Sequence, residues 1–331
     1  MKKIVSFFGD KSEIFIELNE RAKNYAKELG FEYKWAPQLP FNEKDVIEEL
    51  KNADAGIIDI EPYNERIFKE IYARTKILVR FGVGYDKVDL NSATEYGIAI
   101  ARTTAANTTA VAEMALLLIL ATKRQLNINQ ECIRTGKWIK NVSHEIINGT
   151  VGILGFGNIG RKLAQLLKGF DCRIVAYDPY PNEEIMKELG VEKVSLEELF
   201  KISDAISIHV PYSQATHNMV NESLLSLMKP TAVIVNTAIG NIIDENALYK
   251  VLLEKKIAGA GLDVFAVEPL PLDSPLLKLD NIILTPHVSS QTVESLWNIY
   301  KMAIDICADF FAGKNSPHIL NPDYINHVKN Q

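Results

Sequence analysis

Short apolar runs and longer amphipathic stretches alternate along the first hundred residues. The apolar runs, which have the length of buried strands, lie at 2–8, 32–35, 55–58, 77–80 and 98–101. The stretches between them carry apolar residues at helical spacing and lie at 12–29, 43–51 and 64–74. Strands separated by helices predict a parallel sheet, because the chain must cross back before it forms each new strand.

A second alternating series begins at Thr150. Its six apolar runs lie at 151–154, 173–177, 205–209, 232–236, 258–263 and 282–284. Six strands with intervening helices are typical of a doubly wound nucleotide-binding sheet. The pattern as a whole therefore predicts an α/β protein with two parallel-sheet domains.

Three further segments connect or complete the two series. The stretch 107–126 is helical and very apolar at its centre, so we expect a helix buried between two lobes. Residues 127–148 are polar and less regular and include Trp138, which predicts an extended arm. The helix predicted at 291–311 is long enough to cross back onto the first lobe, so that lobe is expected to be discontinuous.

Composition and charge exclude several classes of partner. A length of 331 residues suits two domains, and the 47% hydrophobic and 24% charged residues are typical of globular proteins. The net charge of −6 argues against the broad basic face that nucleic acid or anionic lipid requires. The longest apolar run, at 114–121, has eight residues. A membrane span needs about 20, so we expect neither a nucleic-acid partner nor a membrane partner.

The cysteines and the N-terminal residues bear on compartment and metal binding. Cys132, Cys172 and Cys307 have no metal-ligand spacing, which predicts no metal site and fits a reducing cytoplasm. The apolar run at 4–8 is too short for the core of a signal peptide. The expected location is cytoplasmic.

A glycine motif opens the second series. Gly155, Gly157 and Gly160 follow the strand at 151–154 and begin a helix at 158–168. The first glycine suits a tight turn, the second lets backbone approach a pyrophosphate, and the third allows close packing of helix on strand. We expect Gly155, Gly157, Asn158 and Ile159 to contact a dinucleotide. A glycine turn that only packs a helix is the alternative.

Asp178 indicates which dinucleotide is bound. It ends the next strand, 18 residues after Gly160, where a carboxylate accepts hydrogen bonds from the ribose hydroxyls and repels a 2′-phosphate. The residues that follow it, Pro179 and Tyr180, supply no cation. This arrangement favours NAD over NADP.

Together with this fingerprint, several motifs resemble those of the NAD-dependent D-2-hydroxyacid dehydrogenase family, and phosphoglycerate dehydrogenases in particular. The resemblance covers nearly the whole chain. The motifs are RFGVGYDKVD at 80–89, VAE at 111–113, the glycine fingerprint, HVP at 209–211 with Thr216, NTAIG at 236–240 with Asp244, GLDVF at 261–265 with Glu268 and Pro269, and TPH at 285–287.

The resemblance implies a fold and a reaction. A flavodoxin-like substrate domain would comprise residues 1–101 and 287–331, with a Rossmann cofactor domain inserted at 102–286 and a cleft between them. A homodimer would form through the cofactor domains and the arm after Leu126. The implied activity is reduction of a 2-keto acid or related ketone to the (R)-hydroxy product by hydride transfer, or the reverse.

The resemblance also assigns residues to the reaction. Reducing a carbonyl needs a proton donor that works near neutral pH, and His287 matches the family's donor, paired with Glu268. Backbone amides of Val83 and Gly84, with help from Arg80, are expected to receive a substrate carboxylate. The remaining cofactor contacts are expected at His209, Val210, Pro211, Thr216, Thr237, Ala238, Asp263 and His287, with Asp263 meeting the nicotinamide carboxamide.

Less specific interpretations of these residues remain. Taken without the family, His287 would be a histidine at a strand end, Glu268 a solvated loop acid and Asp263 a strand-end cap. The glycines at 82 and 84 would then form an ordinary strand-to-helix turn.

Ile239 departs from the family's pattern. The motif at 236–240 has an arginine in the family at the position of Ile239, where its guanidinium holds the substrate. Three explanations are open: a substrate carboxylate held elsewhere, a weak or inactive protein that binds NAD for regulation, or a bulkier apolar substrate. The retained Glu268 and His287 favour an active reductase of altered specificity. A non-redox enzyme of similar nucleotide fold, such as a methyltransferase, fits Asp178 less well.

Overall fold

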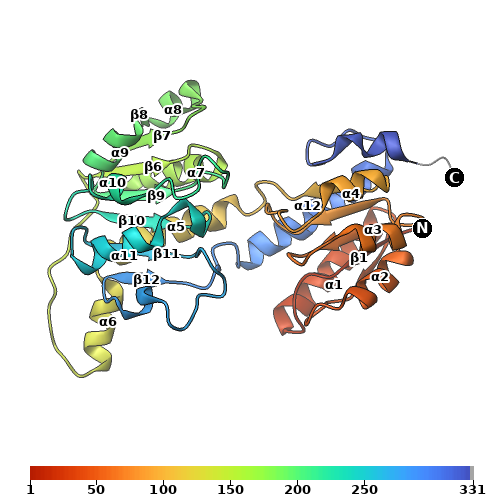
Figure 1. Ribbon diagram of the computed structural model, residues 1–331, viewed down its shortest axis with the longest axis horizontal. Helices are drawn as coiled ribbons and strands as arrows, with labels where there is room; N and C mark the ends of the chain where they lie inside the picture. Colours follow the sequence, from red (N-terminus) through yellow and green to blue (C-terminus); the bar gives the residue numbers. More distant parts are fainter. Residues whose placement is uncertain (329–331) are drawn as a thin grey trace. The chain divides into compact units, whose positions relative to one another are not determined.

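The computed structural model describes residues 1–328 and divides the chain into two compact units (Figure 1). Unit 1 comprises Met1–Asn107 and the chain from Thr292 onward, and unit 2 comprises Thr108–Gln291. Unit 1 therefore extends to Asn107, beyond the expected residue 101, and resumes at Thr292, beyond the expected residue 287. Thr103 still donates its N–H to Arg80 of unit 1, and the N–H of His287 bonds the carbonyl of Asp263 in unit 2.

Unit 1 is built on a five-stranded parallel sheet with strand order β2-β1-β3-β4-β5, the flavodoxin-like order. Its strands are β1 (Lys2–Ser6), β2 (Phe31–Trp35), β3 (Ala55–Ile58), β4 (Ile77–Arg80) and β5 (Ala99–Arg102). Its helices are α1 (Glu13–Glu28), α2 (Glu43–Lys51), α3 (Glu65–Ile71), α4 (Leu90–Glu95) and α12 (Val293–Phe311), followed by the 3-10 helix η4 (Pro322–His327). Side chains of α1 and α12 pack on one face of the sheet and those of α2 and α3 on the other.

Unit 2 contains a seven-stranded parallel sheet in the order β12-β11-β10-β9-β6-β7-β8. The order reverses beside β6, as in doubly wound dinucleotide-binding folds. The strands are β6 (Thr150–Leu154), β7 (Arg173–Tyr177), β8 (Glu192–Lys193), β9 (Ala205–Ile208), β10 (Val233–Asn236), β11 (Gly259–Leu262) and β12 (Ile282–Leu284). The predicted fold class, two parallel-sheet α/β domains, is confirmed.

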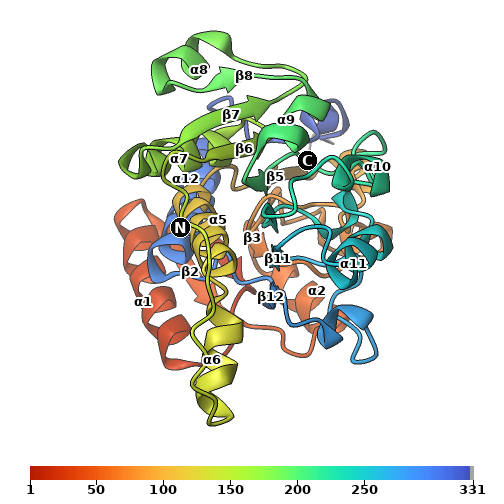
Figure 2. The same cartoon turned by 90° about the vertical axis from the view of Figure 1, so that its left-hand side faces the viewer.

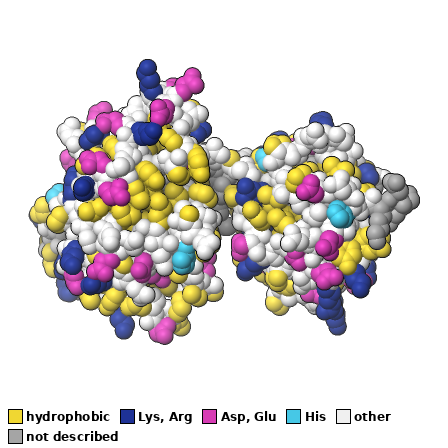
Figure 3. Space-filling model, turned by 45° about the horizontal axis from the view of Figure 1, so that its top comes forward, with side chains coloured by type: hydrophobic (Ala, Val, Ile, Leu, Met, Phe, Trp, Pro, Cys, Tyr) yellow, Lys and Arg dark blue, Asp and Glu magenta, His cyan; other side chains and the backbone are white. Residues whose placement is uncertain are grey.

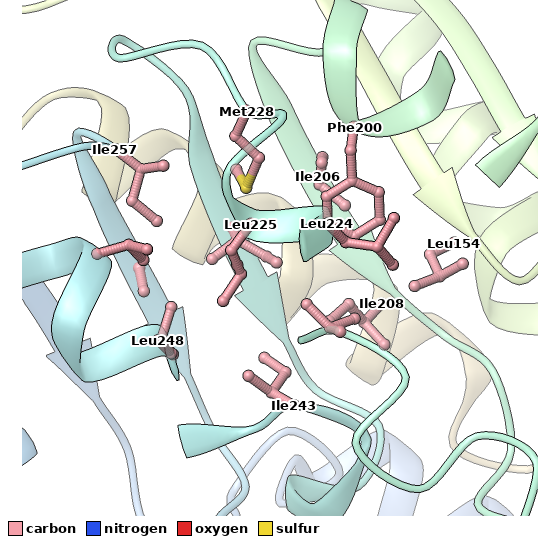
Figure 4. Packing of buried hydrophobic residues seen from close by; sticks show 14 of the residues in the cluster. Leu154, Phe200, Ile206, Ile208, Leu224, Leu225, Met228, Ile243, Leu248 and Ile257 are labelled. Atoms are coloured by element: carbon pink, nitrogen blue, oxygen red, sulfur yellow. The ribbon is translucent and has the colours of Figure 1, made fainter. Parts of the chain in front are cut away.

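Most helices of unit 2 cover the two faces of this second sheet. In chain order, the helices of the unit are α5 (Thr108–Lys123), α6 (Leu126–Arg134), α7 (Asn158–Leu167), α8 (Glu183–Leu189), α9 (Leu196–Ile202), α10 (Glu222–Leu225) and α11 (Glu245–Leu253), with 3-10 helices η1 (Lys168–Phe170), η2 (Gly240–Ile242) and η3 (Pro275–Lys278). Side chains of α5, α7 and α8 pack on one face. On the other face, Phe200 of α9, Leu224 of α10 and Leu248 of α11 pack against strand residues such as Ile206 (Figure 4).

Several elements were not expected from the sequence, among them α4 and η4 in unit 1 and β8 and α6 in unit 2. The two-residue edge strand β8 makes the sheet seven-stranded, and α6 occupies part of the segment that the polar pattern predicted as an irregular arm. Figure 2 shows α6 extending away from the sheet of unit 2. None of the residues of α6 is buried. Its amphipathic pattern therefore does not show which element it packs against.

The surface fits the charge inferred from composition. On the face drawn in Figure 3, Lys and Arg side chains lie among Asp and Glu side chains in both units. No helix within residues 1–328 is long and apolar enough to span a bilayer.

Candidate functional site

The carboxyl edge of the seven-stranded sheet gathers most of the candidate residues. Because all its strands are parallel, the loops that follow them emerge at one edge. The loops after β6, β7, β9, β10, β11 and β12 carry, in that order, the glycine motif, Asp178, the segment 209–216, the segment 237–240, Glu268 and His287.

The glycine loop has the geometry that a dinucleotide requires. Gly155 has a φ of +96°, and a Cβ there would lie 2.6 Å from the backbone nitrogen of Val210. A Cβ at Gly160 would overlap the carbonyl oxygen of Gly155, so the helix packs closely on the loop. Gly157 is exposed at the N-cap of α7, and a Cβ there would meet nothing within 4 Å. The open backbone beside a helix N-terminus fits a pyrophosphate.

Asp178 connects the end of β7 to this loop. Its Oδ2 accepts the N–H of Phe156 at 2.7 Å and its Oδ1 accepts the N–H of Tyr180 at 2.8 Å. The side chain is half-buried, and each carboxylate oxygen retains a further lone pair. The carboxylate of Asp178 is thus fixed beside the glycine loop, and its contact with ribose hydroxyls stays a prediction.

The loop after β9 holds a neutral histidine. Burial lowers the pKa of His209 to about 3, and its Nε2 lies 2.8 Å from the hydroxyl of Ser207. Val210 is buried, and the carbonyl of Pro211 accepts the hydroxyl of Thr216 at 2.8 Å. These bonds stay within β9 and the loop that follows it, and the backbone of His209 and Val210 lies against Gly155.

The loop after β10 carries Ile239. The side chain of Asn236 donates to the carbonyl of Ile239 at 2.9 Å and accepts the N–H of Ala238 at 3.0 Å. Thr237 is buried and its hydroxyl has no hydrogen-bond partner among residues 1–328. The Ile239 side chain is 40% exposed, although it is large and apolar. The turn is thus rigidly built, but it presents an apolar group to its surroundings.

His287 and Glu268 form a pair at the same edge. The Nδ1 of His287 lies 2.7 Å from Oε2 of Glu268, whose Oε1 accepts the N–H of Phe265 at 3.0 Å. The histidine has a φ of +53°, a conformation that non-glycine residues adopt rarely and often at functional sites. Its side chain is 54% exposed, so the ring is held by a carboxylate and remains accessible.

Asp263 holds the loop that carries this histidine. Its Oδ1 accepts the N–H of Val288 and the hydroxyl of Thr285, and its Oδ2 accepts the N–H and hydroxyl of Ser289. The side chain is fully buried. The expected direct contact between Asp263 and the nicotinamide carboxamide does not match this burial, because all four bonds stay within the protein. The sequence analysis included Thr285 in the TPH motif without giving it a role and did not single out Ser289, because hydroxyl residues near a strand end are common.

The other expected residues lie at the carboxyl edge of the sheet of unit 1. Arg80 ends β4 and is 8% exposed, whereas Val83 and Gly84 lie in the exposed loop that follows it. The carbonyl of Val83 accepts the guanidinium of Arg102 at 3.3 Å. Arg80 lies 3.6 Å from Asp59, an acid that the sequence pattern gave no reason to select.

Comparison with known proteins agrees with this arrangement. A family described as "D-isomer specific 2-hydroxyacid dehydrogenase, NAD binding domain" matches residues 116–289. Glyoxylate reductase of Korarchaeum cryptofilum is 37% identical over 324 residues, which cover 95% of this chain and 97% of that protein. D-3-phosphoglycerate dehydrogenase of Methanocaldococcus jannaschii is 37% identical over 281 residues, or 84% of this chain and 53% of that protein.

A solved structure shows the same architecture. D-2-hydroxyisocaproate dehydrogenase superposes with a TM-score of 0.87 at 29% identity, covering 97% of this chain and all of the other (100%). The glycine loop and Asp178 provide the geometry that NAD needs, and the family supplies the class of reaction. The chain therefore belongs to the D-isomer specific 2-hydroxyacid dehydrogenase family of NAD-dependent oxidoreductases.

Proposed function

We propose that this enzyme reduces a 2-keto acid, or a related ketone, to the (R)-hydroxy product with NADH, or runs the reverse reaction, and that His287 is its proton donor. The observation that carries the proposal is the 2.7 Å pairing of Nδ1 of His287 with Glu268. NADH, when bound, supplies the hydride. The glyoxylate reductases among the relatives make glyoxylate the first substrate to assay.

The pair has the properties of a general acid and its orienting partner. The Glu268 carboxylate fixes the ring through Nδ1, so Nε2 is the nitrogen that gives its proton to the substrate oxygen. The hydrogen bond from the N–H of Phe265 holds Glu268 in place, and the Asp263 network fixes the backbone of the loop at 285–289. Proton donor and partner are thereby set before substrate arrives.

The substrate carboxylate needs a separate site, because position 239 has no cation. In the proposal, backbone N–H groups of Val83 and Gly84 receive it, together with the guanidinium of Arg80. The half-exposed Ile239 then contacts an apolar part of the substrate, which alters specificity relative to family members with arginine. The apolar side chain at this position is also the observation that favours the second candidate, an NAD-binding regulatory protein with little or no turnover.

We also propose that the enzyme is a homodimer joined through the cofactor unit and the arm after Leu126. Several large apolar side chains of the arm are exposed, among them Trp138 at 82% and Val142 at 90%. Exposed large apolar side chains on one segment support an interface there.

Replacing His287 with Gln is expected to lower kcat on glyoxylate by about 10²- to 10⁴-fold, because general acid catalysis contributes roughly that much. The Kd for NADH, measured by fluorescence titration, should stay nearly unchanged. His217→Gln, an exposed histidine in the loop after β9, is the matched control and should keep kcat.

Glu268→Gln tests the partner in the same assay. Without the carboxylate that orients the ring, kcat should fall by about ten-fold or more, while the Kd for NADH stays nearly unchanged. A kcat equal to that of the parent enzyme would show that Glu268 is an ordinary loop acid.

Cofactor choice is expected to depend on Asp178. The enzyme should bind NADH at least about ten-fold more tightly than NADPH, because a 2′-phosphate would face a carboxylate. Asp178→Asn should narrow that ratio, whereas Asp171→Asn, an exposed acid before β7, should leave it unchanged. Equal affinity of the parent enzyme for both cofactors would contradict the assignment.

Ile239→Arg should raise kcat/KM on pyruvate or 2-ketobutyrate by about ten-fold or more, since a charge-assisted contact is restored. Ile239→Met, long but uncharged, is the control and should show no such gain. Thermal melting separates this effect from destabilisation by a poorly solvated charge. A folded, NADH-binding Ile239→Arg variant that shows no gain on any 2-keto acid would favour the regulatory candidate.

The dimer is tested by light scattering. Trp138→Asp combined with Val142→Asp should shift the enzyme toward monomer, because two charges would lie in an apolar interface. Leu272→Asp, at a side chain that is 96% exposed outside the arm, should leave the mass unchanged. A parent enzyme that is monomeric at micromolar concentration would refute the proposed assembly.

A further inference from the structure

Arg80 is a buried cation beside a backbone loop. Its side chain is 10% exposed, and its Nη1 donates to the carbonyl of Phe81. A Cβ added at Gly82 would lie 3.6 Å from that nitrogen, so the guanidinium lies against the backbone that leads to Val83 and Gly84. Arg80 is thus a buried positive group beside the backbone that leads to the amides proposed to receive the substrate carboxylate.

A carboxylate already faces this guanidinium. Asp59 follows β3, and β3 and β4 pair in a register that sets Ile58 opposite Arg80. Oδ1 of Asp59 lies 3.6 Å from Nη1 of Arg80, which is close enough for charge attraction but too long for a hydrogen bond. The same oxygen accepts the N–H of Ile60 at 2.8 Å. The pair therefore neutralises the charge of Arg80 and leaves its remaining donors open to another anion.

The surroundings make Asp59 easy to protonate. Burial raises the pKa of Asp59 to about 6. The positive charge of Arg80 opposes this increase, and the negative charge of Glu61 adds to it. The hydroxyls of Tyr63 and Tyr300 are the other titratable groups that sense its charge. Both phenols have a raised pKa, mainly because they are buried, so they stay neutral while Asp59 titrates.

We propose that Asp59 competes with the substrate carboxylate for Arg80 and so determines how tightly the enzyme binds 2-keto acids. The inference rests on the proposed function in one respect, that Arg80 receives the carboxylate. When Asp59 is ionised, an incoming anion meets a negative charge in a poorly solvated place, and the guanidinium is already compensated. When Asp59 is protonated, only the smaller contributions of Glu61 and Asp86 still compensate Arg80, and more of its charge faces the anion. Binding of a carboxylate is therefore accompanied by uptake of a proton at Asp59.

The test uses oxamate, an unreactive monoanionic analogue of a 2-keto acid, and the full-length enzyme saturated with NADH. Asp59→Asn is expected to lower the Kd for oxamate about ten-fold near pH 8, because one opposing charge is gone. The KM for glyoxylate should fall by a similar factor, while kcat stays within about two-fold, since Asp59 acts only through Arg80. Calorimetry in buffers of different ionisation enthalpy should show that the parent takes up about half a proton per oxamate between about pH 6 and 7, the amount that a ten-fold difference in affinity implies, and that the variant lacks this uptake.

Asp54→Asn is the matched control. Asp54 lies at the other end of the same strand and pairs with Arg74 at 3.1 Å, so the substitution has the same chemistry away from the loop. It should change neither the Kd for oxamate nor the proton uptake.

Three outcomes overturn the proposal. Weaker oxamate binding by Asp59→Asn would mean that Asp59 positions Arg80 for the anion instead of competing with it. An unchanged Kd with unchanged proton uptake would mean that the carboxylate of oxamate does not bind close enough to Asp59 to sense its charge. Arg80→Gln that binds oxamate as tightly as the parent would remove Arg80 from the carboxylate site. An absence of glyoxylate turnover would instead contradict the proposed reaction. Oxamate binding and the accompanying proton uptake do not require catalysis, so they still test the role of Asp59.

Discussion

A carboxylate withdrawn from water must be surrounded by hydrogen-bond donors, and Asp263 meets this requirement at the end of β11. Its two oxygens accept four bonds from Thr285, Val288 and Ser289, all on the loop that follows β12. Any other path of this loop would leave a buried charge without donors. The backbone of His287 is thereby held in a left-handed conformation that its sequence does not favour.

Asp59 is also a poorly solvated carboxylate, but it lacks the set of hydrogen-bond donors that surrounds Asp263. This acid also follows a central strand of a parallel sheet, but it has one backbone donor and a guanidinium 3.6 Å away. With so few donors, burial dominates and the pKa of Asp59 rises to about 6. Asp263 is thus a buried carboxylate whose hydrogen bonds are all made within the protein, whereas Asp59 can gain or lose its charge near neutral pH. Similar residues at similar places in two sheets differ because their hydrogen-bond donors differ.

Family membership fixes the cofactor and the class of reaction, while the loops decide what is reduced. The glycine turn, Asp178 and the loop after β9 support one another through backbone contacts and hydrogen bonds. By contrast, Ile239 and the loop after β4 present partly exposed side chains on well-anchored backbone. Substitutions in these loops can alter substrate preference without disturbing the sheet that binds the cofactor.

The sequence by itself determined the two parallel sheets, because buried strands and amphipathic helices leave periodic patterns in hydrophobicity. It also predicted the glycine loop and the acid at Asp178. Close approach of the backbone needs glycine, a negative charge needs an acidic residue, and both occur at a fixed spacing along the chain. It missed β8, whose two residues are too few for a pattern, and it missed the helical form of α6, which buries no side chain.

Only the tertiary structure decided the burial of Asp263 and the approach of Asp59 to Arg80. Each of these depends on loops that are distant along the chain and that meet because their strands are neighbours in a sheet. The protonation of a carboxylate is set by the donors and charges that surround it in space, and the order of residues along the chain does not specify those surroundings.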